Sequence, residues 1–217
     1  MLALFKTRWS QFLEESNERS VQVALGKTVE KYFHLNRLVV PVYKDLTAPR
    51  NIFFYEAATP FEFLVINRNN IDTAAPAYRV ISRRSKGLLN VQMGYFAFAA
   101  SFNGEIIADI WCASPRHTFT DPIHPDLAWL GITSGIKEVY MYDMYVAPEF
   151  RGKAATTFLL GSALNYLKKE GFEKVYGFYE KNNFPALWTH RLFGYTELEN
   201  RRVSRILMFK ISKAVTI

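Results

Sequence analysis

Residues 144–160, MYVAPEFRGKAATTFLL, constrain the fold more than any other stretch because the backbone geometry changes abruptly there. They predict a strand that stops at Pro148, a short turn that carries Arg151 and Gly152, and then a helix that opens with small residues. The first amides of a helix have no partner within the helix. With Arg151 and Lys153 beside them, these amides predict a binding site for an anion such as a pyrophosphate.

The composition predicts one globular unit. The chain has 217 residues, of which 49% are hydrophobic, so it can bury one sizeable core. We expect a single structural domain, in which residues 1–90 form an N-terminal extension of helices and strands and residues 91–217 form the core. Because the formal net charge is +7, the partners are expected to be anionic.

The distribution of basic residues argues against nucleic acid as a partner. Lysine and arginine are scattered in pairs and form no run of five or six. Cys112 is the single cysteine, so an internal disulfide is excluded. No stretch approaches 18 apolar residues, and the first residues lack the features of a signal peptide. We therefore expect a cytoplasmic protein without a membrane span.

Hydrophobic periodicity predicts a mixed α/β (α+β) chain. The pattern Asn103-Gly104 between two apolar runs is the clearest signal, and it predicts a β-hairpin with a type I′ turn. Helices are predicted at residues 3–17, 19–34, 152–170 and 185–193. Strands are predicted at residues 38–43, 52–55, 61–66, 94–102, 105–112, 138–146, 175–179 and 203–211, and residues 113–128 are predicted to form a loop. The sheet should have helices packed against it.

Two motifs, together with the predicted order of strands and helices, resemble the GNAT superfamily (Gcn5-related N-acetyltransferases) over about residues 90–200. The family signature Gln/Arg-x-x-Gly-x-Gly/Ala falls on Arg151, Gly152, Lys153, Ala154, Ala155 and Thr156. Two positions depart from it, since Ala154 stands where glycine is usual and Thr156 where glycine or alanine is usual. The second block, residues 183–195, is similar to the family's Asn-x-x-Ala segment, with His190 at the usual tyrosine position.

The resemblance implies a GNAT fold with a mixed, mostly antiparallel sheet, and acetyl-CoA or another acyl-CoA as co-substrate. The pantetheine arm would run along the strand end at Met144, Tyr145 and Val146, and the pyrophosphate would lie on residues 151–156. Asn183 would bond the pantetheine amides, cap the following helix, or do both. The amine would attack the thioester directly, without an acyl-enzyme.

The candidates for the proton transfers of such a reaction are Asp143, His190 and Tyr142. Asp143 lies in an otherwise apolar and aromatic strand, so its carboxylate either orients or deprotonates an amine or is a hydrogen-bonded structural group. His190 is a candidate acid for the departing thiolate. The alternative is that His190 is an ordinary half-buried histidine and that Tyr179, Tyr142 or water supplies the proton.

The acceptor is expected to be a small molecule with a primary amine, and residues 1–90 are expected to form its side of the site. Aromatic residues make up 16% of the chain, and a surplus of them could line a channel for a long acyl chain delivered by an acyl carrier protein. A third interpretation is a CoA-binding module that has lost turnover. A homodimer is possible. His117, Asp121, His124 and Asp126 share one loop, but their spacing does not predict a metal site.

Overall fold

The computed structural model describes residues 34–48, 60–72, 77–118, 120–206 and 209–215. The strands are β1 (His34–Asp45), β2 (Glu62–Ile66), β3 (Ala77–Tyr78), β4 (Phe96–Phe102), β5 (Glu105–Ala113), β6 (Glu138–Val146), β7 (Lys174–Glu180), β8 (Thr196–Glu197), β9 (Arg201–Ile206) and β10 (Phe209–Ala214). The helices are α3 (Ile81–Gln92), α4 (Pro125–Leu130), the short 3₁₀ turn η1 (Pro148–Phe150), α5 (Ala155–Lys169) and α6 (Phe184–Leu192). Of the helices in these ranges, none has the length and apolarity that a bilayer crossing needs.

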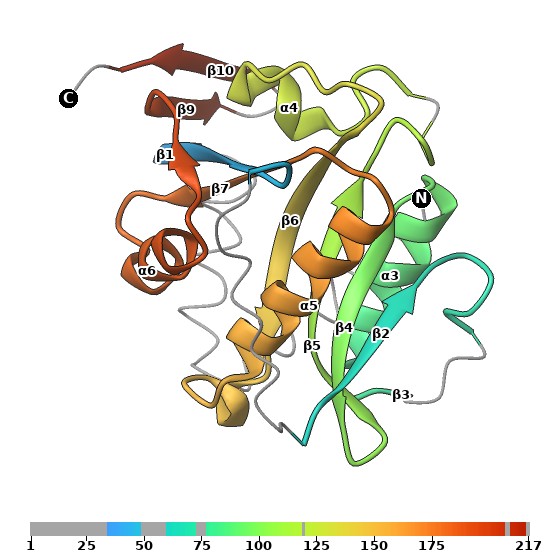
Figure 1. Ribbon diagram of the computed structural model, residues 1–217. Coiled ribbons are helices and arrows are strands. Elements are labelled where there is room, and N and C mark those ends of the chain that lie inside the picture. Colours follow the sequence, from blue (N-terminus) through green and yellow to red (C-terminus); the bar gives the residue numbers. More distant parts are fainter. Residues whose placement is uncertain (1–33, 49–59, 73–76, 119, 207–208, 216–217) are drawn as a thin grey trace.

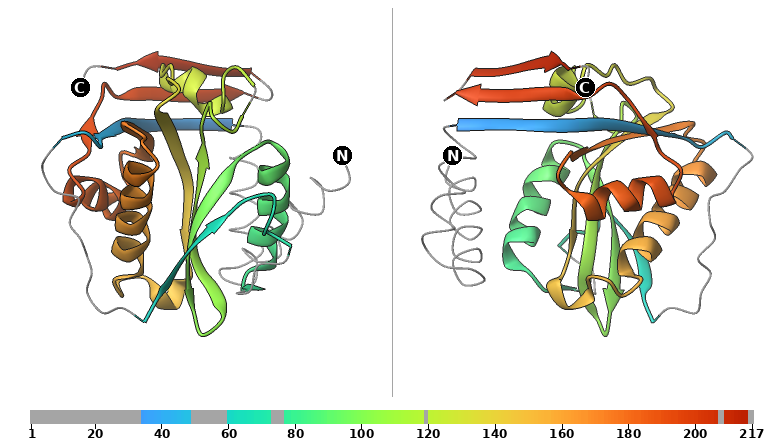
Figure 2. Two further views of the ribbon diagram at one scale, coloured as in Figure 1. Left: turned by 45° about the vertical axis from the view of Figure 1, so that its right-hand side comes forward. Right: turned by 90° about the vertical axis from the view of Figure 1, so that its left-hand side faces the viewer.

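All strands belong to one mixed sheet, with the order β10-β9-β1-β7-β6-β5-β4-β2 and with β3 and β8 attached to β5 and β1. Neighbours along this order are antiparallel except for β6 and β7, which are parallel. Helices α5 and α6 lie on one face of the sheet and α3 on the other, and β1, β9 and β10 run across the ends of the central strands (Figures 1 and 2).

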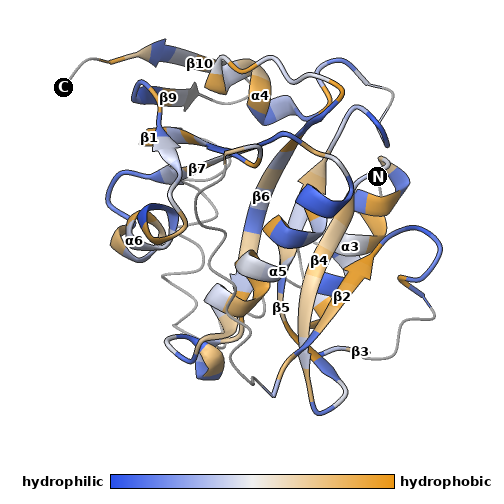
Figure 3. Ribbon diagram, viewed as in Figure 1, coloured by the Kyte–Doolittle hydropathy of each residue, from blue (hydrophilic) through white to orange (hydrophobic). Residues whose placement is uncertain are grey.

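The central strand β4 explains how both faces are covered. Phe96, Phe98 and Ala100 pack into the core under α5, whereas Ala97 and Ala99 alternate onto the α3 face. The small side chains on that face leave room for α3 to approach closely. Figure 3 shows β2 and β4 as mainly hydrophobic and the last turns of α5 as hydrophilic, as expected for a sheet buried between helices.

The first described strand, β1, pairs with β9, which lies near the C-terminal end of the described residues. β1 lies between β7 and β9, and it is antiparallel to both. The predicted strand at residues 38–43 falls within β1. The predicted helix at residues 3–17 and the strand at residues 52–55 lie outside the described residues. The predicted helix at residues 19–34 also lies outside them except for His34, which is instead the first residue of β1.

The hairpin prediction is confirmed: β4 and β5 are antiparallel, and Asn103 and Gly104 have φ values of 50° and 79°. Two other predictions were wrong, and one helix was missed. The predicted loop at residues 113–128 ends in α4, which is capped by His124 and begins with proline. The single strand predicted at residues 203–211 is instead part of the antiparallel pair β9 and β10. Helix α3 was missed because its buried side includes Ser82, Arg83 and Gly87 rather than an apolar stripe.

Candidate active site

β6 and β7 part after a short stretch of parallel pairing. The two strands pair only from Glu138 to Tyr140 and from Lys174 to Tyr176. From Gly177 to Glu180, β7 continues to pair with β1 on its other side. β6 continues along β5 as far as Val146. The edge of β6 from residue 141 to residue 146 therefore faces away from β5 into the space that separates it from β7, where it can bind an extended ligand.

The turn after β6 presents backbone amides at the end of this edge. Arg151 closes the turn by donating from Nε to the main-chain oxygen of Val146 at 3.0 Å. Gly152 and Ala154 have φ values of 75° and 50°, and residues 151–154 are exposed. No side chain caps the start of α5. The amides of Arg151, Lys153 and Ala155 donate to main-chain oxygens within the turn. The amides that follow at the start of α5, together with the cations Arg151 and Lys153, form a suitable place for an anion.

The left-handed turn also explains why α5 starts later than predicted. The sequence predicted a helix from residue 152, but α5 begins at Ala155. Positive φ values at Gly152 and Ala154 interrupt the helical path. Ala154, at the position where the GNAT signature has glycine, thus adopts a conformation that glycine accepts most readily.

Asn183 has a structural role at the start of α6. Its side-chain oxygen accepts a hydrogen bond from the amide of Ala186 at 3.2 Å. This is the capping contact that the sequence left as one of two compatible roles. Its contact with a pantetheine arm stays a prediction.

His190 lies on α6, which packs next to β7. Its ring stacks on Tyr179, with the centroids 5.3 Å apart, and meets the ring of Tyr195 edge-on at 4.9 Å. A Cβ built on Gly177 would lie 3.9 Å from Nε2 of His190 and 3.4 Å from the main-chain oxygen of Met141. Nε2 is therefore close to the place where β6 and β7 separate.

The protonation state of His190 follows from its contacts. Nδ1 lies 2.7 Å from the main-chain oxygen of Ala186. A carbonyl oxygen can only accept, so Nδ1 carries the proton and Nε2 of the neutral ring has a lone pair. Burial lowers the pKa of His190, and the bond to Ala186 only partly opposes it. Near neutral pH the ring is thus set up to accept a proton at Nε2, and it can donate one there only after it has accepted one.

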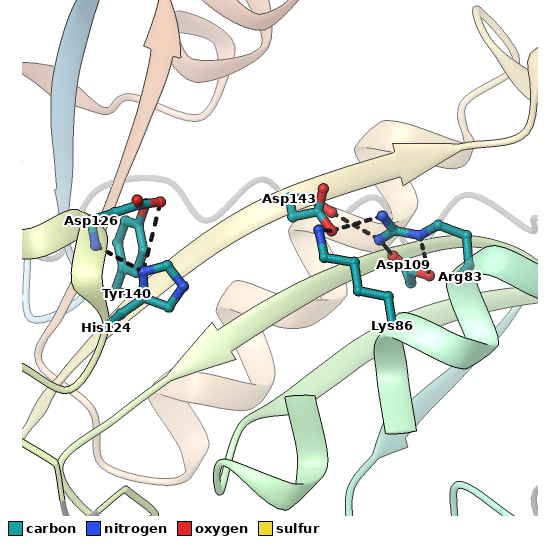
Figure 4. A network of polar contacts seen from close by, with 7 residues as sticks. All are labelled: Arg83, Lys86, Asp109, His124, Asp126, Tyr140 and Asp143. Carbon is teal, nitrogen blue, oxygen red and sulfur yellow. Dashed lines mark hydrogen bonds and ion pairs between the residues drawn. The ribbon is translucent and has the colours of Figure 1, made fainter. Parts of the chain in front are cut away.

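Asp143 is held by two cations from α3 (Figure 4). Its Oδ2 accepts from Nη1 of Arg83 at 2.7 Å and from Nζ of Lys86 at 2.6 Å. Arg83 also binds the carboxylate of Asp109, which is buried. Burial acts to raise the pKa of Asp143, but the charges and hydrogen bonds of Arg83 and Lys86 outweigh it, so the net pKa is lowered. A carboxylate with a lowered pKa is a weak proton acceptor, which favours the structural interpretation over the role of base.

Tyr142 lies on the α3 side of β6 in an aromatic group. Its ring contacts Tyr95, His124 and Tyr140, with centroids at 5.8, 4.2 and 5.4 Å. Burial raises its pKa well above the ordinary value of a tyrosine. Its catalytic role stays a prediction, and its burial in this group does not favour it.

The loop that includes His124 and Asp126 forms a polar cluster of its own next to Tyr142. Tyr140 donates its hydroxyl proton to Asp126 at 3.1 Å, and Trp129 donates to the same carboxylate at 2.9 Å. These contacts fix α4 against the sheet. Within the described ranges, His, Cys, Asp and Glu side chains form no group of three that could hold a metal ion.

Comparison with known proteins places this geometry in a family. The sequence model of the acetyltransferase (GNAT) family matches residues 60–195. The chain belongs to the GNAT acetyltransferase family. Both the resemblance seen in the motifs and the predicted fold class are thereby confirmed, and membership of this family supports the expectation of an acyl-CoA-dependent transferase. A search of curated proteins finds no significant match.

Solved GNAT structures share the fold at low sequence identity. One is a fungal multi-domain GH3 β-N-acetylglucosaminidase with a GCN5-related glucosamine N-acetyltransferase region, at 17% identity and a TM-score of 0.54. Another is a tandem GNAT protein from the clavulanic acid biosynthesis pathway, at 12% identity and a TM-score of 0.53. The matches cover 84% and 89% of this chain, but only 22% and 59% of those chains.

Most of the predicted site residues lie near the end of β6 or on α6. Met144, Tyr145 and Val146 lie at the end of β6, residues 151–156 lie in the turn after it and the start of α5, Asn183 caps α6, and His190 lies within α6. Sequence reasoning missed Arg83, Lys86 and Asp109 as parts of the site. The one available signal was Asp143, a carboxylate in an apolar strand that required a partner.

A separate hollow of about 700 Å³ lies at the far end of α5, next to the start of β4 and the segment that follows β5. Its lining includes Tyr95, Phe96, His117 and Tyr166. The predicted site residues do not line this hollow, so it is separate from the candidate site.

Proposed function

We propose that the protein transfers an acetyl group from acetyl-CoA to a primary amine of a small molecule, by direct attack in a ternary complex. The observation that supports this proposal most is the parting of β6 from β7 beside the exposed turn that leads into α5, whose start no side chain caps. The strand edge suits an extended pantetheine arm, and the helix start suits a pyrophosphate.

The strand edge would also activate the thioester. Backbone N–H groups near Tyr145 and Val146 can donate to the carbonyl oxygen, where negative charge develops when the amine attacks. The bond between the amine nitrogen and the acyl carbon forms, and the bond between that carbon and sulfur breaks. One proton must therefore pass from nitrogen to sulfur.

His190 is the residue best placed to carry this proton. The lone pair on Nε2 accepts the amine proton as the tetrahedral intermediate forms, and the imidazolium can then give it to the departing thiolate. In this order of proton transfers, His190 acts first as a base and then as an acid. Support comes from the hydrogen bond to Ala186 and from the proximity of Nε2 to the point where β6 and β7 part.

The acceptor would bind on the α3 side. Lys86 and Asp143 lie on this face with side-chain exposures of 31% and 30%. Because α3 belongs largely to the first ninety residues, its contribution supports the expectation that the N-terminal region forms the acceptor side. The exact amine is open, and amino sugars, amino acids and polyamines form a suitable test panel.

A donor assay tests the proposal. Release of free CoA thiol is followed with acetyl-CoA, a long-chain acyl-CoA and an acylated carrier protein, each against the amine panel. Acetyl-CoA turnover supports the proposal, and preference for long-chain donors would replace it with the long-chain alternative. The rings of Phe61, Phe102, Phe150 and Phe158 pack on one another at 5.5 to 6.3 Å and against the core. This packing favours the short donor because the rings are engaged with one another rather than lining a channel. Tight CoA binding without turnover would indicate a binding module.

A further inference from the structure

Asp143 forms a bulge in β6 in which its backbone takes an unusual conformation. Tyr142 pairs with Trp111 and Tyr145 pairs with Asp109, so two residues of β6 lie opposite one residue of β5. Asp143 has a φ of 54°, in the left-handed region that side chains with a Cβ disfavour. Such a conformation persists only where surrounding contacts hold it.

Arg83 makes these contacts. Its Nη2 donates to the main-chain oxygen of Asp143 at 3.0 Å, and its Nη1 donates to the side chain of the same residue at 2.7 Å. Its Nε binds Asp109 at 3.2 Å, and its guanidinium lies 5.3 Å from the ring centroid of Tyr145. One side chain from α3 thus contacts the bulge and both residues of the pair that follows it. Figure 4 shows its contacts with Asp143 and Asp109.

The position of the bulge gives the contacts of Arg83 a consequence for the free edge of β6. The pairing of β6 with β7 ends at Tyr140, and the bulge lies between Tyr140 and the end of the strand at Val146. A bulge redirects the peptide groups that follow it. The amides of Met144, Tyr145 and Val146 therefore take their direction from a backbone conformation that Arg83 holds.

We propose that Arg83 is a positioning residue for acyl transfer, which fixes the bulge at Asp143 and thereby the β6 edge that would bind the thioester. The chemical consequence rests on the proposed function, whereas the effect on the bulge does not. The competing explanation is that Arg83 only neutralises the buried carboxylate of Asp109.

A double variant separates the two explanations. Arg83→Gln alone would leave Asp109 charged and unpaired in the core, so it is combined with Asp109→Asn. The pair removes both charges, yet the main-chain oxygen of Asp143 still loses its donor. The matched control is Arg84→Gln, because Arg84 is the next residue and its side chain is 49% exposed beside Asp72.

Amide hydrogen exchange of the full chain, read on peptides that span residues 141–146, gives the direct measurement. In the double variant, exchange there should accelerate by about tenfold or more, because a hydrogen bond from a charged donor is lost. CoA affinity, measured by calorimetry, should fall in parallel. Arg84→Gln should change neither. Unchanged exchange in the double variant would overturn the proposal.

A rescue variant tests whether the backbone conformation is what matters. Glycine adopts positive φ without the penalty of a side chain, so adding Asp143→Gly to the double variant should restore the slow exchange and part of the CoA affinity. If exchange stays fast, Arg83 acts through the charge cluster alone and the proposal is wrong. If the wild-type chain fails to bind CoA, the proposed function fails, while the exchange data still decide the role of Arg83.

Discussion

The imidazole of His190 donates from Nδ1 to the main-chain oxygen of Ala186, one helical turn earlier on α6, at 2.7 Å. This bond fixes both the orientation of the ring and its tautomer. It leaves the lone pair of Nε2 on the side of Gly177, where β7 leaves β6. A residue at the usual tyrosine position of the family is thereby arranged as a proton acceptor.

The pH dependence of turnover tests this arrangement. Because burial lowers the pKa of His190, the ring is neutral at pH 7 and becomes protonated only in acid. kcat/KM should therefore fall as the pH falls through a midpoint below about 6.5. His190→Gln should lower kcat by about a hundredfold and remove this acid limb. His117→Gln, at the separate hollow, is the matched control. A full rate or an intact limb in His190→Gln would contradict the role.

The phosphate contacts are tested with two ligands. Arg151→Gln should raise the Kd for CoA by about tenfold, because a cation next to the helix start is lost. It should not affect binding of pantetheine, which lacks the pyrophosphate. Lys169→Gln, at the opposite end of α5, should leave both affinities unchanged. Equal losses for CoA and pantetheine would show that Arg151 acts on the fold of the turn.

Ala154 offers a prediction on stability. Its φ of 50° disfavours alanine, so Ala154→Gly should raise the free energy of unfolding by about 1 kcal/mol. Ala155→Gly is the matched control, because Ala155 is the first residue of α5 and is buried, and it should instead lower the free energy by about 1 kcal/mol. Urea denaturation measures both changes. The same sign for both would contradict the left-handed turn.

The buried pair between Arg83 and Asp109 should contribute far more than an exposed pair. Asp109→Ala leaves a buried cation with one partner fewer and should lower the free energy of unfolding by about 3 kcal/mol. Glu173→Ala breaks an exposed pair, in which the side chain of Lys137 is 56% exposed and that of Glu173 is 50% exposed. This variant should lower the free energy of unfolding by less than about 1 kcal/mol. Comparable losses would mean that water reaches Asp109.

Local patterns predicted the elements that depend on local physics. The Asn103-Gly104 turn is dictated by neighbouring residues and was found where the sequence placed it. Helix α5 was also found, although it begins at Ala155 rather than at residue 152. Helix α3 was missed because Gly87 faces Trp111: a Cβ there would lie 3.0 Å from the indole ring. Close approach required a glycine, and ion pairing required an arginine, so the inner face of the helix has no hydrophobic period.

Long-range contacts explain what the sequence left open at the site. Asp143 stood out as a carboxylate in an apolar strand, but its partner Arg83 lies 60 residues earlier. Nothing in the spacing links the two residues. The insertion of β1 between β7 and β9 likewise depends on pairing across the whole chain.

Titration of the 217-residue chain with CoA, followed by the backbone amide signals in NMR spectra, shows whether the end of β6 and the turn after it bind the co-substrate. We expect saturable binding of one CoA per chain, with the largest shifts at residues 141–146 and 151–156. Absence of binding, or shifts confined to the hollow lined by Tyr95 and His117, would contradict this expectation.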